Sequence, residues 1–116
     1  MQHRAYLMRL KEQKIEAYAD AHAKEKIWPS VVEGLKAAGV TKMIIIQLGQ
    51  DVILFEEAED LDNAYRYLAQ DAPSVEWDKM IGSWMELYPQ TRPDTGQSAF
   101  VALPVVFYLE SGQLRH

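Results

Sequence analysis

The residues best suited to acid–base chemistry are Tyr18 and His22, which stand four positions apart. Side chains at this spacing share one face of a helix, so the phenol and the imidazole would lie side by side. An imidazole has an unperturbed pKa of about 6.5 and can both give and take protons near neutral pH. The structural alternative is that His22 ends the helix favourably near its C-terminus, with Tyr18 half-buried. The spacing alone leaves both interpretations open.

The other polar candidates support weaker interpretations. His3 and His116 lie close to the chain ends, and we expect both to be solvated. Retaining glycosidase chemistry would need two inward carboxylates at a set separation. A solvated face and a helix N-cap are the expected roles of the acidic run Glu56, Glu57, Glu59, Asp60 and Asp62. No metal-ligand spacing, glycine-rich phosphate loop or Ser-His-Asp order stands out, so we expect no metal site.

Tryptophans form the third group. Trp77 and Trp84 lie seven residues apart on one predicted helical stripe, a pattern that usually marks a core. The alternative is that one of the two indoles lines a polar pocket and stacks on a sugar ring. Trp28 precedes a proline and is predicted to anchor the start of the next helix in the core.

Composition and charge exclude several classes of protein. The chain of 116 residues has the size of a single domain, 1–116. A net charge of −5 argues against nucleic-acid binding, which needs a basic patch or stripe. Because there are no cysteines, the chain has no disulfide framework and no thiolate zinc site. No secretory signal is visible and no apolar run approaches the ~20 residues of a membrane helix, so we expect a cytoplasmic protein that meets no membrane.

The elements that must position these residues alternate between strand and helix. The first half predicts a strand, a helix, a second helix and a hairpin, over residues 5–10, 11–26, 29–39 and 42–57. Pro29 suits a first helical turn, where its missing N–H costs nothing, and Gly39 marks the end of that helix. Gly49 and Gln50 separate two strand-like runs, which is a hairpin signal.

The second half predicts two more helices and a last strand. Asp60 is a candidate N-cap, and helical spacing follows it at Leu61, Ala64, Tyr65 and Leu68. Another helix starts at Pro73 and Ser74, with an apolar side made of Trp77, Met80, Ile81, Trp84 and Met85. A loop covers Tyr88–Ser98, and a long last strand covers Ser98–Glu110. Pro104 within that strand indicates an edge position or a bulge.

This order of elements is the split β-α-β arrangement of ferredoxin-like domains. It predicts an α+β fold in which a four-stranded antiparallel sheet carries helices on one face. The hairpin strands are apolar on both faces, with Met43 and Ile45 on one side and Ile44 and Ile46 on the other. Helices can cover only one of these faces. We therefore predict a homodimer packed sheet to sheet, as a dimeric α+β barrel.

The stretch "EAYADAH…IWPSVVEGLKAAG" resembles the L-rhamnose mutarotase family and its L-fucose mutarotase relatives. The likeness covers most of the chain and includes the aromatic-x-x-x-His pattern, Ile-Trp-Pro at 27–29 and the late strand "VVFYL". Members of this family are dimeric ferredoxin-like proteins. The resemblance implies that His22 transfers protons to and from the sugar, that Tyr18 binds or orients it, and that Trp77 lines the pocket. Because only Trp77 matches a pocket position of the family, we expect Trp84 to lie in the core and Trp84→Ala to cost more stability than Trp77→Ala.

Three departures from the family pattern affect the pocket. Glu76 replaces the first of two paired tryptophans, Met43 replaces a tyrosine, and "HAKEKIW" carries two extra residues. Because these departures lie in the sugar pocket, they bear on whether rhamnose is the preferred sugar more than on whether the protein is a mutarotase. The segment "IIIQLGQDVIL" looks closer to the fucose-type branch.

The resemblance implies an aldose 1-epimerase that interconverts the α and β anomers of a 6-deoxyhexose such as L-rhamnose or L-fucose. The anomeric O–H loses a proton while the ring oxygen gains one, so no cofactor is needed. One alternative with this architecture is a dimeric monooxygenase or haem-handling protein that uses His22 as ligand or base. Another is a non-catalytic interaction module, which a buried His22 hydrogen-bonded to the backbone would favour.

Overall fold

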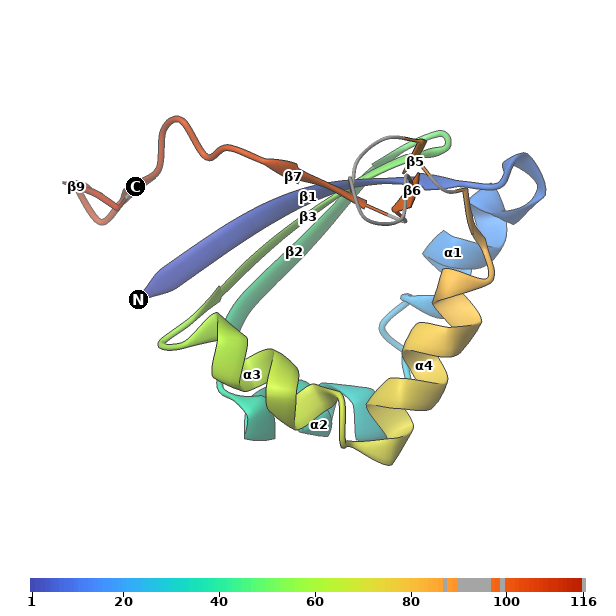
Figure 1. Cartoon of the computed structure of the whole chain (residues 1–116), viewed down its shortest axis with the longest axis horizontal. Coiled ribbons are helices and arrows are strands. Elements are labelled where there is room, and N and C mark those ends of the chain that lie inside the picture. The colour runs from blue at the N-terminus through green and yellow to red at the C-terminus, as the bar shows by residue number, and fades with distance from the viewer. Residues whose placement is uncertain (87, 90–96, 99, 116) are drawn as a thin grey trace.

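The computed structural model is an antiparallel sheet with its helices gathered on one side (Figure 1). It describes residues 1–86, 88–89, 97–98 and 100–115. The main sheet consists of β1 (Gln2–Leu10), β2 (Val40–Leu48), β3 (Asp51–Ala58), β4 (Met85–Glu86) and β7 (Phe100–Leu103). The helices are η1 (Glu12–Lys14), α1 (Ile15–Ala21), α2 (Pro29–Ala38), α3 (Leu61–Leu68) and α4 (Ala72–Gly82). Two short hairpins pair β5 (Tyr88–Pro89) with β6 (Gln97–Ser98) and β8 (Leu109–Glu110) with β9 (Gln113–Leu114).

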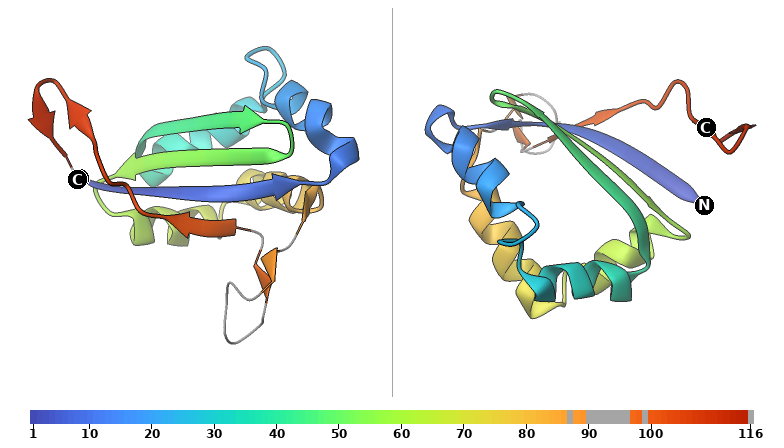
Figure 2. Two further views of the ribbon diagram at one scale, coloured as in Figure 1. Left: turned by 90° about the horizontal axis from the view of Figure 1, so that it is seen from above. Right: turned by 180° about the vertical axis from the view of Figure 1, so that it is seen from behind.

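The predicted fold class is confirmed, because β1 lies between β3 and the last strands and all neighbours run antiparallel. The views from above and from behind show all four α-helices on the same side of the sheet (Figure 2). The sheet has five strands instead of the predicted four. Met85 starts β4 beside Leu10 instead of extending α4, so both β4 and β7 pair with β1.

The first helix is shorter than the predicted 11–26. It starts as the 3-10 turn η1 and ends at Ala21, with His22 as its C-cap residue. The backbone N–H of His22 still bonds the carbonyl of Tyr18 at 3.3 Å. Irregular turns fill 22–27, and Trp28 is extended (φ −65°, ψ 121°), as a residue before proline must be. His22 therefore ends the helix in a helical backbone conformation, one turn after Tyr18.

Local end signals set both ends of α2 and the start of α3 as predicted. Pro29 lies in the first turn of α2, and Gly39 closes this helix in the left-handed region (φ 94°), which suits glycine. The carboxylate of Asp60 caps α3 by accepting from the N–H of Asn63 at 3.0 Å. The helix predicted at Pro73 starts one residue earlier, capped by Asp71, and ends at Gly82, before Trp84.

The prediction of one long last strand is wrong. It stops at Leu103, and the chain leaves β1 at Pro104, which has no N–H to offer a sheet ladder. The segment beyond folds back as the β8–β9 hairpin at the same end of the sheet as the N-terminus (Figure 1). Of the loop predicted over Tyr88–Ser98, only the β5–β6 pair lies within the described residues.

The sheet face away from the helices is apolar and open. Ile44 is 47% exposed, Ile46 60% and Leu48 82%, all on β2. Ile53 of β3 pairs directly with Ile46 on the same face. Within the described residues, no helix is long and apolar enough to cross a membrane.

Candidate active site

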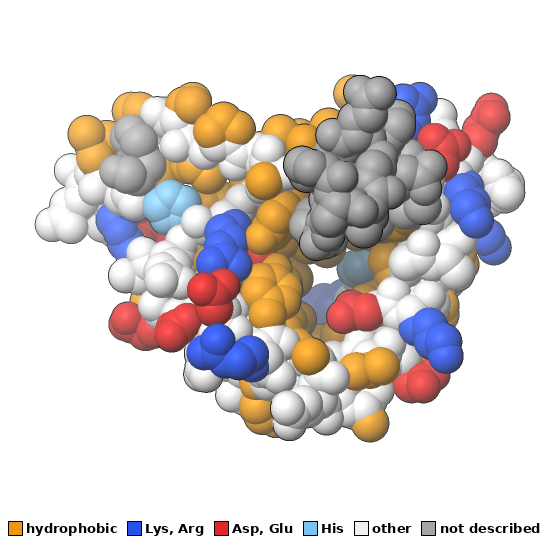
Figure 3. Space-filling model, in the orientation of Figure 1, with side chains coloured by type: hydrophobic (Ala, Val, Ile, Leu, Met, Phe, Trp, Pro, Cys, Tyr) orange, Lys and Arg blue, Asp and Glu red, His pale blue; other side chains and the backbone are white. Residues whose placement is uncertain are grey.

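A cavity of about 570 Å³ lies between the inner face of the sheet and the helices. Its floor is formed by alternate side chains of three strands: Arg4, Tyr6, Met8, Met43, Ile45, Leu54 and Glu56. The helices and the turn after α1 add its walls, which include Tyr18, His22, Ile27, Trp77 and Asp78. Figure 3 shows the molecule hollowed between the sheet and the helices, with hydrophobic and acidic side chains around the opening.

The three residues predicted for the site come together in this cavity. The ring centroid of His22 lies 4.3 Å from that of Tyr18 and 5.1 Å from that of Trp77, which it meets edge-on. Trp77 also meets Trp28 edge-on at 5.1 Å. Tyr18 and Trp77 therefore contact the imidazole on two sides, and Trp28 extends this aromatic wall.

One hydrogen bond fixes the proton on His22. Its Nδ1 lies 2.7 Å from the carbonyl oxygen of Tyr18. A carbonyl oxygen can only accept, so Nδ1 carries the hydrogen and Nε2 of the neutral ring is the basic nitrogen. Among the described residues, Nε2 has no hydrogen-bond partner. His22 is bonded to the backbone but only half-buried, so only one of the two conditions that would favour a non-catalytic module is met.

Tyr18 is 3% exposed, and burial raises its pKa to about 12. It therefore stays a neutral phenol over the physiological range and cannot serve as the base. A neutral phenol can donate a hydrogen bond to a substrate oxygen, which is a positioning role.

Trp84 was expected to be the more buried of the two tryptophans, and the structure shows the reverse. Trp77 is 7% exposed, whereas Trp84 is half-buried beyond the end of α4. Trp84 packs on the edge of the core cluster of Leu10, Tyr18, Val52 and Met85, and Lys14 lies over its ring at 5.4 Å. Trp77 thus belongs both to the core and to the cavity wall. Trp28, predicted as a core anchor, is half-buried against it.

The acidic run is not simply the solvated face that we expected. Glu56 is 2% exposed and lines the cavity, where its carboxylate accepts a hydrogen bond from the hydroxyl of Tyr65. Burial raises the pKa of Glu56, opposed by the Tyr65 hydrogen bond and the charge of Arg4. Glu57 points to the other face and is also buried, with Arg115 3.8 Å away.

Period-two alternation could have revealed Glu56. It shares a strand face with Val52 and Leu54, both of which point inward. Asp78 is a further acidic residue that the sequence did not single out. It lines the same cavity from α4, directly after Trp77. Its side chain is exposed to solvent, and partial desolvation raises its pKa.

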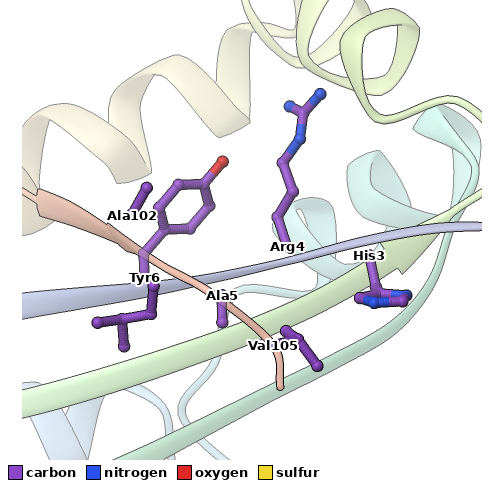
Figure 4. Close-up of a pocket in the computed structure, with 7 residues that line it drawn as sticks. His3, Arg4, Ala5, Tyr6, Ala102 and Val105 are labelled. Carbon is purple, nitrogen blue, oxygen red and sulfur yellow. The ribbon is translucent and has the colours of Figure 1, made fainter. Parts of the chain in front are cut away.

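His3 lies outside this cavity and is not the solvated residue that we expected. It is half-buried on the outer face, with ring centroids 5.9 Å from Phe55 and 5.4 Å from Tyr108. It lines a second hollow of about 400 Å³ where β7 leaves β1, and Arg4 and Tyr6 line both this hollow and the cavity (Figure 4). His116 lies outside the described residues.

Comparison with protein families identifies the chain. The profile of the L-rhamnose mutarotase family matches residues 3–109. The chain belongs to this family. As a mutarotase family member it is a carbohydrate isomerase, an epimerase acting on a sugar. Curated protein sequences include no significant match to it.

Solved structures similar to this mutarotase family member show how widely its fold is shared. An L-rhamnose mutarotase from Formosa agariphila is 23% identical with a TM-score of 0.67, covering 95% of this chain and 100% of that one. A putative antibiotic biosynthesis monooxygenase from Nitrosomonas europaea is 16% identical (TM-score 0.56; 90% and 88% covered). Tetracenomycin F2 cyclase from Streptomyces glaucescens is 17% identical (TM-score 0.54; 96% and 98% covered). At these identities the likenesses show the fold alone.

Proposed function

We propose that this mutarotase interconverts the α and β anomers of a 6-deoxyhexose such as L-rhamnose or L-fucose, with His22 as the proton-transfer group. The observation that best supports this proposal is the position of the imidazole in the aromatic wall of the cavity, where Nδ1 is hydrogen-bonded to the Tyr18 carbonyl. The family match supports the same reaction class.

The proposed reaction moves protons without changing the carbon skeleton. Nε2 of His22 takes the proton of the anomeric hydroxyl as the bond between the anomeric carbon and the ring oxygen breaks. The ring oxygen gains a proton, from water or through a group hydrogen-bonded to it, and an open aldehyde forms. Rotation about the adjacent carbon–carbon bond presents the other face of the aldehyde. The reverse proton transfers then close the ring as the opposite anomer.

The surroundings of His22 suit this role. When Nε2 gains a proton, the positive ring remains bonded to the Tyr18 carbonyl and lies against two aromatic rings. The bond to the carbonyl stabilises a cation. Tyr18, neutral because burial raises its pKa to about 12, donates its hydroxyl hydrogen to a sugar oxygen. The indole of Trp77 offers an apolar surface to the sugar ring.

We also propose a homodimer in which the open faces of two sheets pack together. The exposed row Ile44, Ile46 and Leu48 and the neighbouring Ile53 support this. Contiguous apolar surface of this kind usually marks an interface. The second copy would cover the sheet face that the helices leave open.

Saturation-transfer NMR between anomeric protons tests the enzymatic proposal. We expect the protein to accelerate exchange of L-rhamnose, L-fucose or both, and to act more weakly on hexoses with a 6-hydroxyl. Exchange at the uncatalysed rate for every sugar would contradict the function. Acceleration that ignores the 6-substituent would contradict only the substrate class.

A further inference from the structure

The end of the cavity remote from the core cluster carries a polar network. Glu56 of β3 accepts a hydrogen bond from Tyr65 of α3. Arg4 of β1 lies directly opposite Glu56 in the sheet register and donates to Asp62 of α3 at 2.8 Å. Arg4, Glu56 and Tyr65 all line the cavity that contains His22.

These side chains point into the layer where a substrate would lie. Figure 4 shows Arg4 and Tyr6 projecting from β1 to the same side, away from His3. Glu56 shares that side, since it follows Leu54 by two residues on β3. The network is therefore part of the cavity surface and not of the outer face.

Glu56 has an oxygen left to bind a ligand. Oε1 accepts from Tyr65, whereas Oε2 has no hydrogen-bond partner among the described residues. Among the described residues, Oε2 of Glu57 is the one side-chain nitrogen or oxygen atom that is both inaccessible to solvent and without a hydrogen-bond partner. Oε2 of Glu56 therefore still reaches open space, and the cavity is the space it lines. A carboxylate oxygen with free lone pairs is an acceptor for hydroxyl groups.

The separation of the two ends suits one monosaccharide. Tyr18 packs with Val52 in the core cluster, and Glu56 lies four residues further along the same face of β3. Four strand residues span about 13 Å. A single pyranose with a hydrogen bond at each end spans a similar length. With its anomeric carbon at His22, its hydroxyls on C3 and C4 would face Glu56.

On the basis of the mutarotase function proposed above, we propose that Glu56 is a specificity-determining residue that accepts hydrogen bonds from the C3 or C4 hydroxyl of the sugar. Tyr65 and Arg4 position the carboxylate. A hydroxyl at this end is then required, because a bound sugar lacking it would exclude water from Oε2 of Glu56 and leave that oxygen without a hydrogen-bond partner. The rest of the cavity floor is largely apolar, and its other two polar side chains, Arg4 and Tyr6, do not offer a second carboxylate.

The test compares the sugar that the wild type exchanges fastest with its 3-deoxy and 4-deoxy analogues, using anomeric exchange by NMR. We expect the wild type to discriminate against at least one analogue by about 10- to 100-fold in kcat/KM. Glu56→Met should bring this ratio toward unity by lowering the rate with the parent sugar. Glu56→Gln, which keeps a neutral acceptor, should give an intermediate ratio.

Two further variants separate binding from folding. Glu57→Gln changes the adjacent buried carboxyl, which faces away from the cavity, and should keep the wild-type ratio. Tyr65→Phe removes the hydroxyl that holds Glu56 and should lower the ratio while keeping the ring. An unchanged ratio in folded Glu56→Met would overturn the assignment of Glu56 and leave the mutarotase function standing. No exchange of any sugar by the wild type would overturn both.

Discussion

At the scale of single residues, the tautomer of His22 decides what the site can do. The backbone carbonyl of Tyr18 holds the hydrogen on Nδ1, so Nε2 is ready to accept a proton. The ring sits at a helix end, half-buried, and the turn after α1 lets it reach the cavity.

His22→Ala should lower anomeric exchange by about 10² to 10⁴, the usual contribution of general acid–base help. The protein should stay folded, because the half-buried ring contributes less to the core than the buried Tyr18 beside it. NMR exchange measures the first effect and circular dichroism the second. A folded variant that exchanges sugar near the wild-type rate would remove His22 from the mechanism.

Alkaline pH should destabilise the fold through Tyr18. Burial raises its folded pKa to about 12, above the ordinary tyrosine value of about 10. The unfolded chain therefore releases this proton first, and stability that is full below about pH 10 falls as pH rises toward the folded pKa. The slope from one such group is about 1.4 kcal/mol per pH unit.

Denaturant titrations between pH 9 and pH 12 measure this effect. Tyr18→Phe should flatten the decline by the contribution of one group. Desolvation and the hydrogen bond to Glu56 also raise the pKa of Tyr65, so the contribution of Tyr65 should remain in this variant. Identical pH profiles in the wild type and Tyr18→Phe would show that Tyr18 ionises as easily in the folded state as in the unfolded one.

At the scale of elements, α4 both packs the core and walls the cavity through Trp77. Trp77→Ala should destabilise the protein by about 3–5 kcal/mol, and by more than Trp84→Ala, because Trp77 is the more buried of the two. Chemical denaturation of both variants gives the comparison. Sugar-dependent tryptophan fluorescence should persist in Trp84→Phe and weaken in Trp77→Phe. A larger loss of stability at Trp84 would restore the expectation drawn from the sequence.

The crossing of α2 and α4 depends on a missing side chain. A Cβ on Gly34 would lie 2.6 Å from Asp71 Oδ2 and 2.8 Å from Ser74 Oγ. Those two groups form the cap of α4, since Asp71 accepts from the N–H and the hydroxyl of Ser74. Gly34→Ala should therefore cost about 1–3 kcal/mol by overpacking.

Gly82 provides the matched control for this prediction. Gly82 is the last residue of α4, and a Cβ there would meet nothing within 4 Å. Gly82→Ala should be neutral or stabilise by up to about 1 kcal/mol. Thermal unfolding of the two variants decides the question, and equal effects would mean that α2 and α4 adjust freely at their crossing.

At the scale of the whole molecule, the open sheet face is where a second copy would bind. We expect a dimer at micromolar concentration by sedimentation velocity. Ile46→Lys with Ile53→Lys should give a folded monomer, because both residues project from the open face and are direct neighbours. Val75→Lys, which changes an exposed aliphatic residue on α4, should stay dimeric. A monomeric wild type at this concentration would contradict sheet-to-sheet packing.

Signals that act over a few residues were determined by the sequence itself. Pro29, Gly39 and Asp60 mark helix ends because proline, glycine and a capping carboxylate act on their own backbone. The four-residue spacing of Tyr18 and His22 brought their rings together for the same reason. The continuous apolar runs of β2 and β3 likewise predicted a hairpin with apolar residues on both faces.

Features that depend on distant parts of the chain were decided only by the tertiary structure. Glu56 reads as part of a charge run, yet it is buried because β1 and α3 surround it with Arg4 and Tyr65. The last strand ends at Leu103 because pairing requires β1 beside it, and Pro104 cannot continue the ladder. Burial and strand pairing depend on which surfaces meet after folding, and a short stretch of sequence does not specify which distant residues it will contact.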